Sequence, residues 1–196
     1  MRDDIPWCRD WKTTIRMFKA TDVDRLEVVA LVERAMVDEA TRPHPDVDHA
    51  FDIATASTDL PREAIEYIIK RFLEDSEENP WAWAMASWFL HTFWNDHNFT
   101  SVDRDLIDGL IATLDRPPSG DDHLDFDTTI GVVSALNAAL PAIADDSIWR
   151  LIIERVRELL ARGTDAPEWF RQSCEHIREE YEDMRERAAT RGLSLD

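Results

Sequence analysis

Three stretches of the sequence repeat one apolar spacing, and this repetition restricts the chain to a helical architecture. The stretches are LPREAIEYIIKRFLED from Leu60, SVDRDLIDGLIATLDR from Ser101 and SIWRLIIERVRELLAR from Ser147. When they are aligned, apolar residues coincide in three columns that are four residues apart, as packing on one helix face requires. The columns are Ile65, Leu106 and Ile152, then Ile69, Leu110 and Val156, then Leu73, Leu114 and Leu160, with Val28, Val32 and Met36 of an earlier segment in the same places. The sequence therefore predicts an all-α protein.

Helical spacing runs through most of the chain, in which only five residues are glycine. We expect one domain, 1–196, with 1–21 as an N-terminal segment, 22–165 as paired helices and 166–196 as a terminal helix and tail. Side chains suited to cap helices precede four of the predicted starts, namely Asp59, Asn79, Ser147 and Asp165. The predicted helices span about 22–40, 46–57, 61–75, 80–95, 103–115, 127–143, 147–161 and 166–190.

Each repeated helix is followed by a second helix, and the members of the first apolar column lie 37, 41 and 46 residues apart. Over residues 22–190 this pattern resembles the HEAT-like class of α-helical repeats, whose units are helix pairs of similar length. The resemblance implies a curved stack in which each pair buries its apolar face against its neighbours and leaves an extended surface for a partner. The units are uneven and lack the recurrent proline and Asp-Arg signature of that class. A compact bundle of eight helices is the alternative.

One predicted helix is apolar almost all round. The run NPWAWAMASWFLHTFW, from Asn79, holds four of the chain's eight tryptophans. On a helix these tryptophans fall on two opposite sides, and the only polar strip is formed by Ser87, His91 and Asn95. We expect a central, largely buried helix, with any functional contact on that strip or at an indole such as that of Trp94.

The last predicted helix carries one narrow apolar stripe, and charged residues cover the rest of its surface. The stripe consists of Phe170, Cys174, Ile177, Tyr181, Met184 and Ala188. This pattern predicts a terminal helix that covers the end of the core. A homodimer seam through the first five of these residues is the alternative.

The sharpest local match to a chemical motif is the acidic run Asp121-Asp122-His123-Leu124-Asp125. It resembles, only locally, the DDxxD sequence of isoprenoid synthases, in which aspartates hold magnesium ions that bind a diphosphate. Here the run follows Pro117-Pro118-Ser119-Gly120, which predicts a loop, and no partner motif accompanies it. We expect the aspartates to be solvated in this loop, with Asp125 or Asp127 capping the next helix.

A second group of metal-capable side chains is the run His44-Pro45-Asp46-Val47-Asp48-His49. Asp46 is well placed to cap the following helix, so a structural role is favoured over a metal site. His91 and His97 are six residues apart and point to different sides of a helix. Because no nucleophile turn or glycine-rich phosphate loop is present either, we expect no catalytic residue, metal or cofactor.

Charge limits the partners that the chain can attract. The net charge is -19, which opposes the phosphate backbone of a nucleic acid and favours a basic protein partner. Only Cys8 and Cys174 are cysteines, so neither a disulfide framework nor a zinc motif is predicted. The start of the chain lacks an apolar signal core, and no run is long enough to span a membrane. We expect a cytoplasmic protein, and adaptation to salt is an equal explanation of its acidity.

These features favour a non-enzymatic, acidic protein-binding module. In composition the chain resembles bacterial immunity proteins, which neutralise a toxin that often acts on nucleic acid. The expected contact residues are Ser87, His91, Trp94, Asn95, Asp121, Asp122 and Asp125. The alternatives are a metal-dependent or small-molecule α-helical enzyme that uses the DDHLD run or His91, and a self-associating structural protein.

Overall fold

The fold consists of helices joined by short loops, and the all-α prediction is confirmed. The computed structural model describes residues 25–95, 99–162 and 167–194, and no strand occurs in these ranges. The helices are α2 (Arg25–Ala40), α3 (Asp48–Ala56), α4 (Arg62–Asp75), α5 (Ala82–Asn95), α6 (Arg104–Leu114), α7 (Asp122–Ala139), the 3₁₀ turn η1 (Leu140–Ala142), α8 (Asp146–Ala161) and α9 (Glu168–Thr190).

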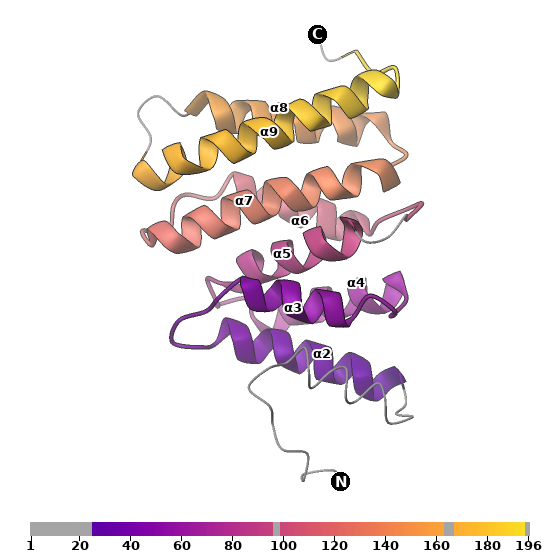
Figure 1. The fold of residues 1–196 in the computed structure, drawn as a ribbon, viewed down its shortest axis with the longest axis vertical. Coiled ribbons are helices and arrows are strands. Elements are labelled where there is room, and N and C mark those ends of the chain that lie inside the picture. Colours follow the sequence, from indigo (N-terminus) through magenta and orange to yellow (C-terminus); the bar gives the residue numbers. More distant parts are fainter. Residues whose placement is uncertain (1–24, 96–98, 163–166, 195–196) are drawn as a thin grey trace.

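The helices stack across the long axis of the molecule, from α2 at one end to α8 and α9 at the other (Figure 1). One layer contains α3, α5, α7 and α9, each packed on the next. In the other layer α2 packs on α4 and α6 packs on α8, and every one of these helices also contacts its partner in the first layer. This packing is compatible with stacked helix pairs and with a bundle, the two arrangements that the sequence left open.

The predicted apolar columns lie in the core. Every residue of the first two columns is buried, whereas Leu73 and Leu160 of the third column are half-buried. The largest fully buried side chains include Phe72, Phe89 and Phe93. Burial of such side chains supplies the main driving force for folding, at about 1.5–3 kcal/mol each.

Helix α5 is the central helix that its composition predicts. Its contact with α7 is the most extensive contact between any two helices described. The approach is close because α7 has a glycine there: a Cβ added at Gly131 would lie 2.5 Å from Ser87 Oγ and 3.0 Å from the Trp88 indole. The two backbones therefore approach more closely at this point than a side chain would permit.

Helix α7 starts five residues before the predicted position. Asp121 is its N-cap, and the Asp121 carboxylate accepts hydrogen bonds from His123 N at 3.0 Å and Leu124 N at 3.2 Å. The prediction of a loop over the DDHLD run was wrong, as was the choice of Asp125 or Asp127 as the cap. The helix also ends earlier, at Ala139, because Pro141 lacks the N–H that would continue it and a 3₁₀ turn follows.

The other predicted caps have mixed outcomes. Asn79 Oδ1 accepts from Trp81 N at 2.9 Å, as expected of a residue that starts the tryptophan helix. Helix α8 is capped by Asp145, which accepts from Ser147 N at 2.8 Å, so the prediction of Ser147 as the cap was wrong. Helix α4 has Pro61 at its N-cap position and no side-chain cap, in contrast to the prediction for Asp59. Asp165 lies outside the described residues.

Polar side chains join α4 to the start of α6. Lys70 Nζ donates to Asp103 Oδ2 at 3.0 Å and to Asp105 Oδ2 at 2.7 Å, and buried Glu66 accepts from Asp103 N at 2.9 Å. Burial raises the pKa of the Glu66 carboxyl. These contacts fix the second layer where apolar contact is limited.

Within the described residues, no helix is both long and apolar enough to cross a membrane.

Candidate functional site

Three hollows follow one another along one edge of the stack, where the loops within the helix pairs lie. We call this surface the loop edge and define it by residues 41–47, 76–81 and 115–121, which connect α2 to α3, α4 to α5 and α6 to α7. The α2–α3 loop and the start of α7 mark this edge on the left of Figure 1. Side chains from successive helix pairs meet there.

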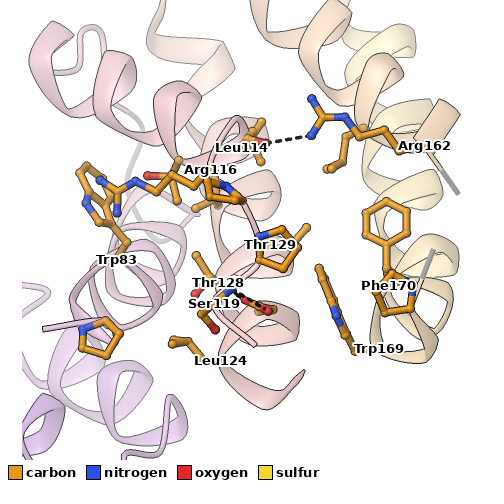
Figure 2. Close-up of a pocket in the computed structure, with 18 residues that line it drawn as sticks. Trp83, Leu114, Arg116, Ser119, Leu124, Thr128, Thr129, Arg162, Trp169 and Phe170 are labelled. Atoms are coloured by element: carbon orange, nitrogen blue, oxygen red, sulfur yellow. Dashed lines mark hydrogen bonds between the residues drawn. The ribbon is translucent and has the colours of Figure 1, made fainter. Parts of the chain in front are cut away.

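The aromatic pocket is the hollow with the most apolar walls (Figure 2). It has a volume of about 380 Å³ and lies between the α6–α7 loop, the start of α7, the end of α8 and the start of α9. Figure 2 shows Trp169 and Phe170 on one side and Trp83 on the other. Such a cavity, apolar with a few polar groups, is typical of a binding site.

The Trp83 wall is fixed by two neighbours. A Cβ added at Gly109 of α6 would lie 2.3 Å from the far edge of the Trp83 ring, so the indole occupies space that only glycine leaves free. The Arg116 guanidinium lies over the same ring, 5.6 Å from its centroid, within reach of a cation–π interaction. The position of the indole is therefore set by two neighbours within the chain.

The rim of the aromatic pocket is held by charged side chains that bind backbone groups. Asp125 accepts from Ser119 N at 2.9 Å and 3.0 Å, which folds the α6–α7 loop back onto the first turn of α7. Arg162 donates to Leu114 O at 3.4 Å and lies 3.7 Å from Asp115. These contacts shape the opening of the pocket.

Two hydroxyl groups of α7 line the pocket beside its apolar walls. Thr128 and Thr129 line it from α7, and neither hydroxyl has a hydrogen-bond partner in the part of the chain that the structure describes. Both groups can donate and accept. They are therefore free to bond to polar groups of a partner that flank an apolar side chain in the pocket.

The acidic groove is the largest of the three hollows, with a volume of about 750 Å³. It lies between the end of α2 with its following loop and the end of α4 with its following loop, and Asn79 joins the two loops by donating to Ala40 O at 2.9 Å. Four carboxylates line it, from Glu74, Asp75, Glu77 and Glu78.

Only part of this negative charge is neutralised. Arg71 lies 3.8 Å from Glu74 and 3.2 Å from Asp75. Glu77 and Glu78 are exposed and form no ion pair with any residue in the described ranges. The groove therefore presents excess negative charge beside the half-buried Trp81.

A middle hollow of about 430 Å³ connects the other two. It shares Glu74 and Glu77 with the acidic groove, and it shares Trp83 and Arg116 with the aromatic pocket. Because neighbouring hollows have walls in common, the loop edge forms one sequence of depressions that becomes less acidic and more aromatic toward α9.

The three residues of the polar strip predicted on the tryptophan helix lie in different surroundings. Ser87 is fully buried and donates to Ala84 O at 2.9 Å, because its face of α5 meets Gly131 of α7. His91 packs edge-on against Phe51 and Trp88, and Asn95 Nδ2 lies 3.2 Å from the His91 ring. The structure thus brings His91 and Asn95 together, while Ser87 is not available as a contact residue.

Trp94 is not available either. Its side chain is buried, and its indole N–H has no hydrogen-bond partner among the residues that the structure describes. A buried indole N–H usually has a partner, and the burial of Trp94 does not favour the expected surface anchor at this position. Among the described indoles, those of Trp81, Trp83 and the buried Trp169 line hollows at the loop edge.

The DDHLD run has structural tasks. Asp121 caps α7 and Asp125 binds the loop amides, so two of its three carboxylates already accept hydrogen bonds from backbone N–H groups. Asp122 is exposed in the first turn, where the positive end of the helix dipole favours a carboxylate. Among the residues described, no group of three or more His, Cys, Asp or Glu side chains is arranged to hold a metal.

The histidine-rich run before α3 is tied to α2. Asp46 Oδ1 accepts from Asp48 N at 3.0 Å, but Val47 occupies the N-cap position of α3 without a side-chain cap, so the prediction of Asp46 as the cap was wrong. His49 Nδ1 lies 2.7 Å from the buried carboxylate of Glu39, which also pairs with Arg42 at 2.7 Å. These contacts join the α2–α3 loop to the core, and His97 lies outside the described residues.

The apolar stripe of α9 faces the chain's own core. Phe170, Ile177 and Met184 are buried, and α9 packs against α7 and α8. Three of the five residues of the suggested homodimer seam are therefore not at the surface of the chain. Cys174 and Tyr181 are half-buried, and Cys174 is a free thiol.

Polar side chains also bind α9 to α7. Ser134 Oγ lies 3.1 Å from His176 Nε2 and donates to Glu180 Oε1 at 2.9 Å, while Glu180 Oε1 lies 3.3 Å from the same ring nitrogen. A catalytic Ser-His-acid triad requires the serine and the acid at opposite ring nitrogens. Because Ser134 is also buried, this cluster joins two helices and does not form a triad.

Among the described carboxyl groups, Asp127 has a strongly raised pKa. The pKa of Asp127 is raised to about 6, mainly by burial, with smaller contributions from the carboxylates of Asp46, Asp48 and Asp121 and an opposing one from His123. Asp127 does not line any of the three hollows.

Part of the loop edge is visible in the sequence. The acidic run from Glu74 to Glu78 directly precedes the tryptophan helix, which is a visible signal for a charged surface next to aromatic side chains. Trp169 lies outside the buried stripe of α9, so its separate role was visible only as an unexplained aromatic residue. No sequence pattern indicates that Trp83 and Trp169 line the same pocket, because this depends on how distant helices stack.

Comparisons with protein-family models, known proteins and solved structures found no match.

Proposed function

We propose that the protein is a non-enzymatic protein-binding module that engages its partner along the loop edge. The observation that carries this proposal is the aromatic pocket, whose walls of Trp83, Trp169 and Phe170 are in place without a ligand. Elsewhere in the described ranges, Tyr67 is the large apolar side chain that is strongly exposed. Preformed apolar pockets are where the anchor side chains of a partner contribute most to binding.

The acidic groove supports a basic partner. It adjoins the pocket and belongs to a chain with a net charge of -19. Complementary charge accelerates association and disfavours acidic competitors. An inhibitor that neutralises a basic toxin, including a toxin that acts on nucleic acid, is a protein with these properties, and we place its action in the cytoplasm.

A second candidate function is the binding of a small molecule in the aromatic pocket. The free hydroxyls of Thr128 and Thr129 favour it, and the pocket falls within the range of roughly 300–1,000 Å³ that is usual for such sites. A metal-dependent enzyme at the DDHLD run is not supported, because Asp121 and Asp125 already bind backbone amides.

Affinity capture from a lysate of the source cells tests the proposal. The bait proteins are the wild type, Thr128→Trp, which places an indole in the aromatic pocket, and Thr55→Trp, a matched control at the exposed end of α3 remote from the loop edge. We expect the wild type and the control to retain the same protein, and Thr128→Trp to lose it. Equal recovery on all three baits contradicts a role for the pocket, provided that circular dichroism shows all three to be folded.

A further inference from the structure

We propose that the occupant of the loop edge is an extended segment of the partner, with basic residues in the acidic groove and one bulky apolar side chain in the aromatic pocket. This inference rests on the proposed function and names the kind of partner that the same surface takes.

The arrangement of the hollows favours an extended occupant. They follow the loops of successive helix pairs, and neighbouring hollows share Glu74, Glu77, Trp83 and Arg116. A compact ligand fills one hollow and leaves the others empty. A segment of polypeptide passes along all three, and its side chains enter the depressions in turn.

Charge determines what the segment carries at the acidic end. Arg71 is shared between Glu74 and Asp75, and Arg42 is already paired with Glu39 at 2.7 Å. Glu77 and Glu78 therefore have no cation of this chain to balance them in the described ranges. Arg42 is the cation that lines the groove, and the four lining carboxylates outnumber it. Lysine or arginine side chains of the segment complement this groove, and an acidic segment is repelled.

The pocket determines what the segment carries at the aromatic end. Gly109 and Arg116 fix Trp83, and the Asp125 carboxylate fixes the loop opposite Trp169, so the cavity is preorganised for one bulky apolar side chain. The hydroxyls of Thr128 and Thr129 are placed to bond to the peptide groups beside that anchor. An apolar anchor next to basic residues thus satisfies both ends of the edge.

Selection from a phage-displayed library of random 16-residue peptides tests this inference. The library is selected on the wild type and counter-selected on Thr128→Trp, and the enriched peptides are synthesised for affinity measurements. We expect the enriched sequences to carry at least two lysine or arginine residues on one side of a bulky apolar residue.

Two matched double variants then separate position from net charge. Glu77→Lys with Glu78→Lys reverses the groove, and Glu175→Lys with Glu179→Lys makes the same change on exposed positions of α9. At low salt we expect the groove variant to weaken peptide binding about 10-fold, mainly through slower association, and the α9 variant to weaken it less than about 3-fold. Thr128→Trp weakens it about 30-fold, as expected for a blocked anchor site.

Three results overturn the extended basic segment. They are enriched peptides without basic residues, equal effects of the two double variants, and failure to enrich any peptide that prefers the wild type to Thr128→Trp. The proposed protein-binding function is tested separately, by lysate capture. If capture still depends on the pocket after any of these results, the partner is recognised through a folded surface. If Thr128→Trp loses its cooperative melting transition, Thr129→Phe replaces it as the blocking variant.

Discussion

The acidic groove and the aromatic pocket lie on the same edge of the stack but differ in the secondary structure and in the side chains that form their walls. The groove is walled by loops, and its Glu77 and Glu78 carboxylates are exposed to solvent. The pocket is walled largely by helical side chains, and its Trp83 ring is held by Gly109 and Arg116. One region is formed mainly by loops and is charged, and the other is formed mainly by helices and is largely apolar.

On the proposed function, this difference predicts that the two regions affect different steps of binding. Exposed charges act over about 8–10 Å at physiological salt and mainly change the rate of encounter. A fixed apolar cavity acts only on contact, and it mainly changes the rate of dissociation. We therefore expect kinetic measurements to separate the groove from the pocket.

The largest expected effect comes from Gly131→Val, which disrupts the scaffold that both regions share. A Cβ at this position lies 2.5 Å from Ser87 Oγ, so the branched side chain must push α5 and α7 apart. We expect the free energy of unfolding to fall by about 2–3 kcal/mol in urea denaturation. Ala112→Val, on the exposed face of α6, is the control, with a change within about 0.5 kcal/mol. Similar losses for both variants contradict a tight α5–α7 contact.

Gly109→Ala is expected to impair the pocket and spare the groove. The new Cβ falls 2.3 Å from the Trp83 ring, so the indole must move away from its wall position. We expect a loss of about 1–2 kcal/mol in the free energy of unfolding and about a 10-fold faster dissociation of a selected peptide, with association unchanged.

A rescue experiment checks this explanation. Replacing Trp83 by leucine removes the clash, so adding Gly109→Ala to Trp83→Leu should stabilise α6 by about 0.5–1 kcal/mol through its better helix propensity. Destabilisation in that background shows that something other than the indole opposes a side chain at this position.

Salt is expected to affect the groove and spare the pocket. The association rate of a basic peptide with the wild type should fall about five-fold between low and physiological salt, because exposed charges are screened. With Glu77→Lys and Glu78→Lys the dependence should be much weaker, and stopped-flow measurements resolve the difference. If dissociation rates change with salt as strongly as association rates, the groove does not act mainly on the rate of association.

The smallest expected effect concerns Asp127, an acidic residue that belongs to neither region. Its pKa is about 6 in the folded protein and 3.8 as the ordinary value, so the folded chain binds the proton more tightly than the unfolded chain. Its contribution to stability is complete below about pH 4 and is lost as the pH rises through about 6. Asp127→Asn should therefore raise the free energy of unfolding at pH 7, by less than about 1 kcal/mol because the group is partly solvated. Parallel stability curves for the two proteins from pH 4 to pH 7 contradict this origin.

Much of the fold could be predicted because helical spacing is a local property. Ile65, Leu106 and Ile152 lie at equivalent buried positions, and a single helix face explains each of them. The start of α7 could not be predicted in the same way. Asp121, Asp125 and Asp127 are all competent caps, and the choice depends on Gly120, whose φ of 91° turns the chain, and on the bond from Ser119 to Asp125.

The candidate site was harder to predict because it is formed between helices. A helical wheel places Ser87 on a polar strip, but only the stacking of α5 on α7 shows that Gly131 covers it. Likewise, Trp83 and Trp169 are far apart in the chain and belong to different helix pairs. The acidic residues at the loop edge were visible in the sequence, while the cavity beside them was not.

The close contact at Gly131 sets a fixed distance between two parts of the loop edge. The acidic groove belongs to the helices before this contact and much of the aromatic pocket to the helices after it, so the packing of α5 on α7 sets the spacing between them. Close-packed interiors are only slightly compressible. On the proposed function, we expect a partner to be distinguished by the number of residues between its basic and apolar side chains as well as by their chemistry. A peptide lengthened by one or two residues in that interval should then bind more weakly.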